Sequence, residues 1–220
     1  MRSSKFVAMT FSYFFAILLL PFISYKILSV SFNLTDELSI VVYANLISYI
    51  FLTVIALILF GGYLVEDFKK IESIGKFLKG TLIGWGLLLL ALLVSNLLLI
   101  LITGELDSSQ NQQIVEETLG AYPILMAITT VLFAPLVEEI IFRLMLMKKI
   151  ILHPWFSILF SSFLFAIIHV IQAGDFIFMI PYMAMGIPLG YSYYKTGNIC
   201  YPIGIHLLQN LFSTIAITFI

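Results

Sequence analysis

Long apolar segments separated by short polar loops are the feature that most constrains this chain. Of its 220 residues, 61% are hydrophobic and 10% are charged, and the mean hydropathy is +1.10. A water-soluble domain of this length does not carry such a composition. A helix needs roughly 20 apolar residues to cross about 30 Å of hydrocarbon. The sequence therefore predicts an all-α, polytopic transmembrane helix bundle with about seven spans, near residues 6–30, 39–64, 81–103, 121–147, 155–173, 176–194 and 199–220.

The first and sixth predicted spans are irregular. The first follows Arg2 and Lys5 in the manner of a signal peptide. Its apolar run is too long for the hydrophobic region of such a peptide, so we expect a retained span. The sixth contains Pro181 and Pro188, and each proline removes a backbone hydrogen-bond donor. We therefore expect a kinked or broken helix there.

Basic residues fall in alternate loops, which indicates the orientation in the membrane. With seven spans, one side carries Arg2, Lys5, Lys69, Lys70, Lys76, Lys79, Lys148, Lys149 and Lys195. The other side carries one basic residue, Lys26, together with Asp36, Glu37, Glu105, Asp107, Glu116, Glu117 and Asp175. Because cytoplasmic loops retain lysine and arginine, we expect the N-terminus to be cytoplasmic and the C-terminus to lie outside.

Two connecting segments are long enough to interpret. Residues 66–80 alternate charged residues with apolar ones at helical spacing. This pattern predicts a short amphipathic helix on the inner leaflet, within an N-terminal part, residues 1–120, that also holds the first three spans. Residues 104–120 are polar and show no clear periodicity, so we expect an external loop.

A few strongly polar side chains remain inside the predicted spans. A charged group near the middle of a bilayer costs about 2.5–3.5 kcal/mol on insertion scales, so each needs a partner or a water-filled cavity. The set comprises Glu138, Glu139 and Arg143 in the fourth span, His169 in the fifth, and His206 with Asn210 in the seventh. Taken singly, such residues are explained by a buried ion pair or by a hydrogen bond between helices. Their coincidence in a chain with few other polar groups in its spans indicates a site.

Helical spacing suggests how these residues divide their roles. Glu139 and Arg143 are four residues apart with the acid first, the favourable order for an ion pair. Glu138 points about 100° away around the helix and is left available for other work. His206 and Asn210 are also four residues apart and share one helix face. Counted along its helix, His169 lies deeper than the others, so tilt or a later helix start would have to bring it level.

This set restricts the chemistry. The sequence lacks the G-x-S-x-G and S-x-x-K patterns of serine nucleophiles and the H-E-x-x-H pattern of zinc proteases. Glu138 could take a proton from a water held between it and His169, with His206 and Asn210 donating hydrogen bonds to the oxyanion. Alternatively, Glu138, His169 and His206 form a ligand set suited to zinc. The residues alone leave both mechanisms open.

Three short motifs occur in series on these spans. They are "EEIIFR", "FAIIH" and "HLLQN", which match E-E-x-x-x-R, F-x-x-x-H and H-x-x-x-N. In this the chain resembles the CPBP family of intramembrane proteases, which includes the CAAX-processing endopeptidase and the bacteriocin-processing and self-immunity (Abi) proteins. The resemblance covers residues 121–220 and implies a four-helix catalytic core there. It implies Glu138 as the water-activating base, His169 as its partner, and His206 with Asn210 as oxyanion stabilisers.

The resemblance also implies supporting roles for Glu139 and Arg143, and a glutamate-dependent mechanism without a metal. We therefore expect no cofactor, with zinc as the open alternative.

The function predicted from these observations is that of an intramembrane endopeptidase. It would hydrolyse a membrane-associated or lipidated peptide, or a membrane protein, that enters from the cytoplasmic side. The alternative is a bacteriocin self-immunity or scaffold protein that binds a peptide or partner without cutting it. A proton-coupled carrier is disfavoured because no paired halves are recognisable. No basic patch suits nucleic acid. Besides the lipid bilayer, no partner or oligomeric state is specified, and the composition favours a multi-pass protein of a bacterial plasma membrane.

Overall fold

Helices account for every regular element in the computed structural model, which describes residues 3–105, 107–148 and 153–219. The predicted all-α bundle is therefore confirmed. Among the described residues, six helical rods are long and apolar enough to cross a membrane: Ser3–Ser31, Glu37–Lys69, Ile74–Thr103, Pro123–Met147, Phe176–Thr196 and Cys200–Phe219. The remaining predicted span, near 155–173, corresponds to α8 (Pro154–Val170), a shorter apolar helix whose 17 residues are at the lower end of the length for a full crossing.

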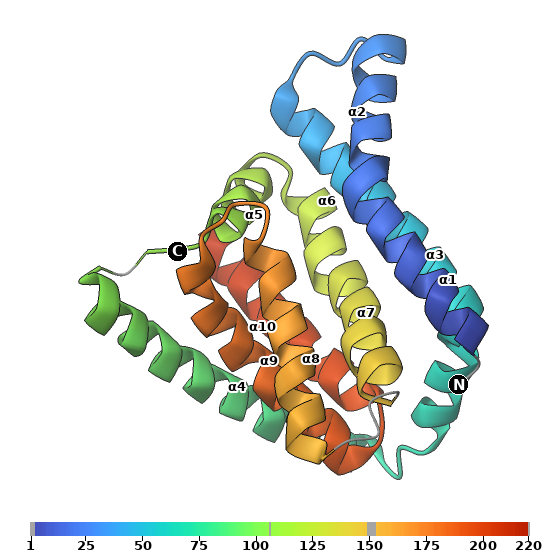
Figure 1. The fold of residues 1–220 in the computed structure, drawn as a ribbon, viewed down its shortest axis with the longest axis vertical. Coiled ribbons are helices and arrows are strands. Elements are labelled where there is room, and N and C mark those ends of the chain that lie inside the picture. The colour runs from blue at the N-terminus through green and yellow to red at the C-terminus, as the bar shows by residue number, and fades with distance from the viewer. Residues whose placement is uncertain (1–2, 106, 149–152, 220) are drawn as a thin grey trace.

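The rods alternate in direction and pack around a central group (Figure 1). Along one edge lie α1 (Ser3–Phe14), α2 (Leu20–Ser31) and α3 (Glu37–Lys69). At the opposite edge α4 (Ile74–Thr103) packs on α9 (Met179–Thr196) and α10 (Cys200–Phe219). The rod that contains α6 (Pro123–Ala127) and α7 (Ala134–Glu139) lies between these edges with α8. It is the most deeply buried of the six rods, because it is surrounded by the others.

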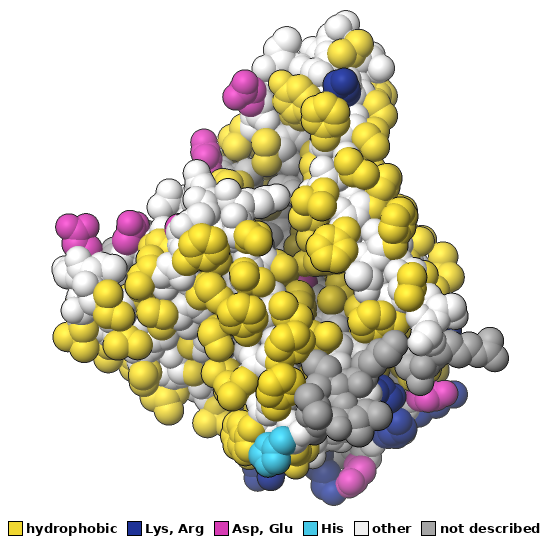
Figure 2. Space-filling model, in the orientation of Figure 1, with side chains coloured by type: hydrophobic (Ala, Val, Ile, Leu, Met, Phe, Trp, Pro, Cys, Tyr) yellow, Lys and Arg dark blue, Asp and Glu magenta, His cyan; other side chains and the backbone are white. Residues whose placement is uncertain are grey.

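Charged side chains collect at the two ends of the bundle and leave an apolar belt between them (Figure 2). What we call the basic end holds the turns after α3 and α9, with Lys69, Lys70 and Lys195. The acidic end holds the start of α3 and the turn before α9, with Asp36 and Asp175. This separation follows the charge pattern predicted from the loops. Which end faces the cytoplasm stays a prediction, and Arg2 and Lys149 lie outside the described residues.

Two prolines set the shape of the rods that carry them. Pro21 follows a π-helical segment, Phe15–Leu19, and Pro135 follows another, Ile128–Phe133. A proline has no backbone N–H, and its ring collides with the carbonyl four residues earlier in an α-helix. In both rods that carbonyl falls inside the π-helical segment, so the wider turn accommodates the ring.

A third π-helical segment, Ile140–Met147, contains no proline and carries Arg143. Its side chains are almost all buried, and the hydroxyl of Ser161 on α8 donates a 2.8 Å hydrogen bond to the carbonyl of Phe142. Single π-helical turns inside α-helices occur often at functional sites. Here the wide turn directly follows the two adjacent glutamates.

The predicted external loop, residues 104–120, is largely helical instead. Helix α5 (Gln110–Ala121) begins at Ser109, whose side chain accepts a hydrogen bond from the Gln112 amide at 3.2 Å. Leu119 packs with Val42 and Met126 in a small cluster at the acidic end. The expectation of a loop was wrong because only this short apolar edge of α5 is buried, which gives a weak periodicity in a polar segment.

The predicted amphipathic helix over residues 66–80 is also absent as a separate element. Residues 66–69 finish α3, a turn follows, and α4 starts at Ile74, with the Ser73 side chain accepting from the Lys76 amide at 3.2 Å. Helical spacing in this segment therefore belongs to the ends of two long helices. Likewise the sixth span is not broken, since α9 runs continuously over Met179–Thr196 with Pro188 inside it.

Glycine allows α8 and α9 to approach closely. A Cβ atom at Gly186 would lie 2.8 Å from the Cβ and 3.0 Å from the Cα of Ser162. Real Cβ atoms do not come this close to a backbone atom without displacing it. The carbonyl of Gly186 is also part of the site described below, so this contact places α9 relative to the buried charges.

We expect Gly186→Ala to lower the thermal stability of the protein in detergent micelles. An extra methyl group in a tightly packed contact costs roughly 1–3 kcal/mol, and here it must push two helices apart. Gly86→Ala is the matched control, because nothing lies within 4 Å of a Cβ at Gly86. An equal melting temperature for the two variants would contradict the close approach of α8 and α9.

Candidate active site

The fourth rod carries a buried ion pair next to a second carboxylate. Glu139 and Arg143 are fully buried, and Glu138 is 5% exposed. Arg143 Nη1 donates to Glu139 Oε1 at 3.1 Å, as the spacing of the two residues predicted. Arg143 Nη2 donates to the carbonyl of Gly186 at 3.0 Å, and the guanidinium lies 5.0 Å from the ring centroid of Phe165. The arginine is thus held from α8 and α9 as well as from its own helix.

His206 joins the two glutamates. Its Nδ1 lies 2.8 Å from Glu139 Oε1, and its Nε2 lies 3.9 Å from Glu138 Oε2. Since Arg143 stabilises Glu139 as a carboxylate, which only accepts hydrogen bonds, Nδ1 of His206 carries the proton. Glu139 therefore orients the imidazole so that Nε2 faces Glu138, in the way a carboxylate orients a histidine in other sites.

Glu138 has a second neighbour that the sequence reasoning missed. The hydroxyl of Tyr49 on α3 donates to Glu138 Oε1 at 3.0 Å. One carboxylate oxygen is thus held by a phenol, and the other faces His206. Nothing in the sequence signalled Tyr49, because a tyrosine in an apolar span resembles any other buried aromatic residue.

His169 lies at the C-terminal end of α8 and is held by its own helix and by α9. Its Nδ1 lies 2.6 Å from the carbonyl of Phe165, and its ring stacks on Tyr182 with 4.4 Å between centroids. A carbonyl only accepts hydrogen bonds, so Nδ1 carries the proton and Nε2 of the neutral ring offers a lone pair. The ring of Phe165 lies 4.7 Å from that of His169 and 5.9 Å from that of His206. Phe165 therefore packs against both imidazoles.

Asn210 lies one turn beyond His206 on α10. Its Nδ2 donates to the carbonyl of Thr130 at 2.8 Å, which fixes the amide plane against the π-helical turn before Pro135. The carbonyl of Thr130 precedes Pro135 by five residues, in the segment where the proline has disturbed the helical hydrogen bonds. The Asn210 amide thus supplies a hydrogen bond to the Thr130 carbonyl, and this hydrogen bond also fixes the orientation of the Asn210 side chain.

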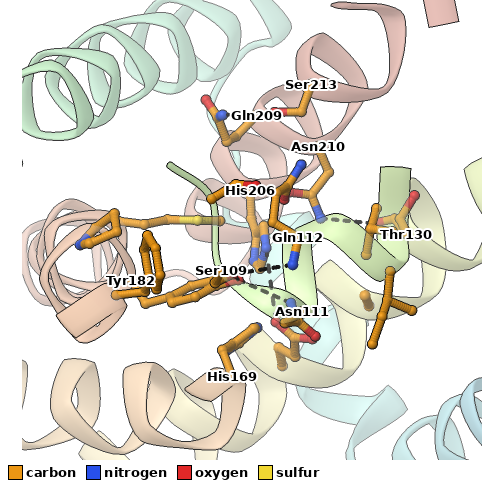
Figure 3. Close-up of a pocket in the computed structure, with 18 of the residues that line it drawn as sticks. Ser109, Asn111, Gln112, Thr130, His169, Tyr182, His206, Gln209, Asn210 and Ser213 are labelled. Carbon is orange, nitrogen blue, oxygen red and sulfur yellow. Dashed lines mark hydrogen bonds and ion pairs between the residues drawn. The ribbon is translucent and has the colours of Figure 1, made fainter. Parts of the chain in front are cut away.

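These side chains meet at a cavity of about 680 Å³ inside the bundle (Figure 3). Glu138 from the fourth rod, His169 from α8, and His206 and Asn210 from α10 all contribute to its wall. Glu139 and Arg143 lie behind the wall and do not line it. The predicted residues are therefore brought together in space as two layers: four at the cavity and two in support. Their chemical roles stay predictions.

The alternative zinc site was tested against the donor set. Among the described residues, no group of three His, Cys, Asp or Glu side chains is placed so that it could hold a metal ion. Glu138 and His206 approach each other to 3.9 Å, but no third His, Cys, Asp or Glu among the described residues completes a ligand group with them. The candidate ligands Glu138, His169 and His206 thus do not fit a zinc ion in this arrangement.

Comparison with known proteins finds a family model similar to the C-terminal part of the chain. Residues 120–212 match the model of the type II CAAX prenyl endopeptidase Rce1-like family. This segment is therefore similar to the family that the three motifs indicated. The chain is also 31% identical over 109 residues to a protein of Bacillus subtilis (strain 168) named "Putative membrane peptidase YdiL". That match covers 49% of this chain and 43% of the relative, so the aligned region spans less than half of that protein. No solved structure matches.

The matched segment includes all six of the polar residues just described. Residues 120–212 contain the two glutamates and the arginine, both histidines and the asparagine. The first three rods lie outside the match, yet α3 contributes Tyr49 to the cavity.

We expect Arg143→Met to lower the free energy of unfolding by about 3–5 kcal/mol, because it leaves the buried carboxylate of Glu139 without its guanidinium partner. The double variant Glu139→Gln/Arg143→Met should recover part of this loss, since both charges are then removed together. Denaturant unfolding in mixed micelles measures the cycle. Strictly additive losses would show that the pair is not coupled.

Proposed function

We propose that the protein is an intramembrane endopeptidase that uses Glu138 to activate water. The observation that carries this proposal is the isolation of Glu138 from the buried ion pair. Its neighbour Glu139 is engaged by Arg143 and His206, whereas Glu138 faces the cavity with one oxygen on Tyr49. A carboxylate that no lysine or arginine contacts among the described residues, and whose nearest basic group is His206 Nε2 at 3.9 Å, is suited to accept a proton from a water in the cavity.

The first step would be attack of water on the peptide carbonyl. Glu138 takes one proton from the water while the water oxygen forms a bond to the carbonyl carbon. The carbonyl π electrons move to the carbonyl oxygen, which becomes the oxyanion. His169 offers a lone pair at Nε2, which can accept a hydrogen bond from the same water. Collapse of the tetrahedral species then breaks the C–N bond. The proton held by Glu138 passes to the leaving nitrogen, so the glutamate returns to its starting state.

The oxyanion would be stabilised from α10. Nε2 of His206 can donate only if the ring is protonated, because Nδ1 already donates to Glu139. Asn210 has a second amide hydrogen beside the one bonded to Thr130, and it can add another donor.

The location of the protein in a membrane follows from its apolar helices. The six apolar rods make this a multi-pass membrane protein. A bacterial plasma membrane is our proposal, supported by the composition and by the Bacillus relative. The partner would be a membrane-associated peptide or a membrane protein.

The two adjacent glutamates give a matched pair of variants. We expect Glu138→Gln to reduce cleavage at least a hundredfold without lowering the melting temperature, because the amide keeps the contact with Tyr49 but cannot accept the proton. Glu139→Gln should lower both, because it removes the partner of Arg143 and His206.

Purified parent and variants are compared in proteoliposomes, with peptide termini from a bacterial membrane extract identified by mass spectrometry. If Glu138→Gln still produces the same new termini as the parent, the protein does not cut by this mechanism. The self-immunity or scaffold alternative would then gain support, provided that the variant still protects cells.

Elemental analysis of the purified protein tests the metal question separately. We expect zinc well below one equivalent, because the donor set does not converge on one point. Stoichiometric zinc that is lost in His206→Ala would overturn the assignment of roles given above.

A further inference from the structure

The cavity extends well beyond the polar residues at its base. Starting at Glu138 and His206, its wall continues to Asp107, Ser109 and Gln112, which lie at the first turn of α5 and just before it. Figure 3 shows Ser109, Asn111 and Gln112 around the same space as His169 and His206. The cavity therefore runs from the buried charges to the acidic end of the bundle.

The opposite direction is closed. None of the described residues at the basic end lines the cavity. There, Asp67 accepts a 3.0 Å hydrogen bond from the amide of Ile199, and its carbonyl accepts from Asn198 at 2.7 Å. The main hydrophobic cluster, which includes Phe60 and Ile199, fills the space between this contact and the site. The expectation that a substrate enters from the basic, cytoplasmic side is therefore not supported by the shape of the interior.

The wall of this cavity is rich in side-chain amides. Six of them line it: Asn45, Asn96, Asn111, Gln112, Gln209 and Asn210. Each amide can both donate and accept hydrogen bonds, as a peptide group does. At membrane depth an extended peptide exposes backbone groups that water cannot satisfy, and each unsatisfied group costs several kcal/mol. A wall of amides supplies the missing partners to an unwound segment without requiring any charge on it.

The first turn of α5 closes the end of the cavity through a small set of hydrogen bonds. The hydroxyl of Tyr182 on α9 lies 2.9 Å from the Ser109 hydroxyl and accepts from Asn111 Nδ2 at 3.0 Å. The amide of Gln110 donates to Asp175 Oδ2 at 2.8 Å. Helix α5 has only 12 residues and buries few of them, so these contacts hold most of its first turn.

We propose that the cavity beneath α5 binds an extended, uncharged peptide segment that enters from the acidic end, and that the first turn of α5 is the gate. The peptide part of this inference rests on the proposed endopeptidase function. Tyr182 links the gate to the site, since its ring stacks on His169 while its hydroxyl holds α5. Opening of the gate and release of His169 are thus coupled through one side chain.

Cysteine labelling tests the route without requiring any cleavage. In a Cys200→Ser background, Thr130→Cys places a thiol of similar size on the cavity wall. A small membrane-impermeant thiol reagent is applied to right-side-out and inverted vesicles. Glu116→Cys and Lys79→Cys report the acidic and basic ends, and Ile58→Cys, whose side chain is 71% exposed on the apolar belt, reports lipid-facing positions.

We expect the thiol at position 130 to react from the same side as the Glu116→Cys thiol and at least tenfold faster than the Ile58→Cys thiol. Reaction from the side of Lys79→Cys, or a rate no greater than that of Ile58→Cys, would overturn the proposed route.

The gate is tested in the same background by Tyr182→Phe. Loss of the hydroxyl frees Ser109 and Asn111, so the labelling rate at position 130 should rise roughly tenfold. Tyr194→Phe, on the same helix with a half-exposed ring toward the basic end, is the matched control and should leave the rate unchanged. Equal rates in Tyr182→Phe and the parent would show that these hydrogen bonds do not hold the gate.

A short, end-blocked peptide of alanine, serine and asparagine serves as the ligand probe. We expect it to slow labelling at position 130, whereas the same peptide with lysine and aspartate at its centre should not. No protection by the uncharged peptide would remove the binding part of the proposal. Because labelling does not need hydrolysis, this failure can be distinguished from failure of the proposed endopeptidase, which Glu138→Gln tests by cleavage.

Discussion

The compensation of one buried carboxylate is the constraint on which the rest of the site depends. Glu139 is fully buried and is contacted by Arg143 and by His206. Leaving such a group unpaired would cost several kcal/mol, so the fold must bring these three side chains into contact. Arg143 in turn needs the carbonyl of Gly186, which fixes α9. One ion pair thus positions three helices. The same contacts fix the position of Glu138, the neighbouring residue on the helix.

Irregular helix geometry makes this arrangement accessible. Glu138 and Glu139 lie in the regular α-helix α7, about 100° apart, but a regular α-helix on both sides of them would satisfy all of its own carbonyls. Pro135 instead widens the preceding turn, and Asn210 bonds to the carbonyl of Thr130 there. After the glutamates, the π-helical segment exposes the carbonyl of Phe142 to Ser161. The side-chain hydrogen bonds that link the fourth rod to α8 and α10 arise where its own backbone ladder is disturbed.

Sequence reasoning predicted the parts of this protein that follow from strong local rules. Span lengths follow from hydropathy, and the pairing of Glu139 with Arg143 follows from the four-residue spacing. It failed where the signal depends on tertiary contacts. Helix α5 has a short buried edge that only the Leu119 cluster explains, and residues 66–80 share their periodicity between two helices. Tyr49 and Tyr182 could not be singled out, because a buried tyrosine shows its hydrogen-bond partner only in three dimensions.

The depth of the site and the direction of its cavity have to be considered together. Along the fourth rod, Glu138 follows Pro123 by about 23 Å of helix, and Met147 follows Glu138 by about 14 Å. The base is therefore nearer the basic end, while the cavity reaches it from the acidic end through the longer path. A peptide segment that binds along this path in an extended form gives up its own helical hydrogen bonds over that length. The side-chain amides along the wall can form hydrogen bonds with such a segment in place of those that it loses. An extended peptide bond can then lie next to Glu138, accessible to water.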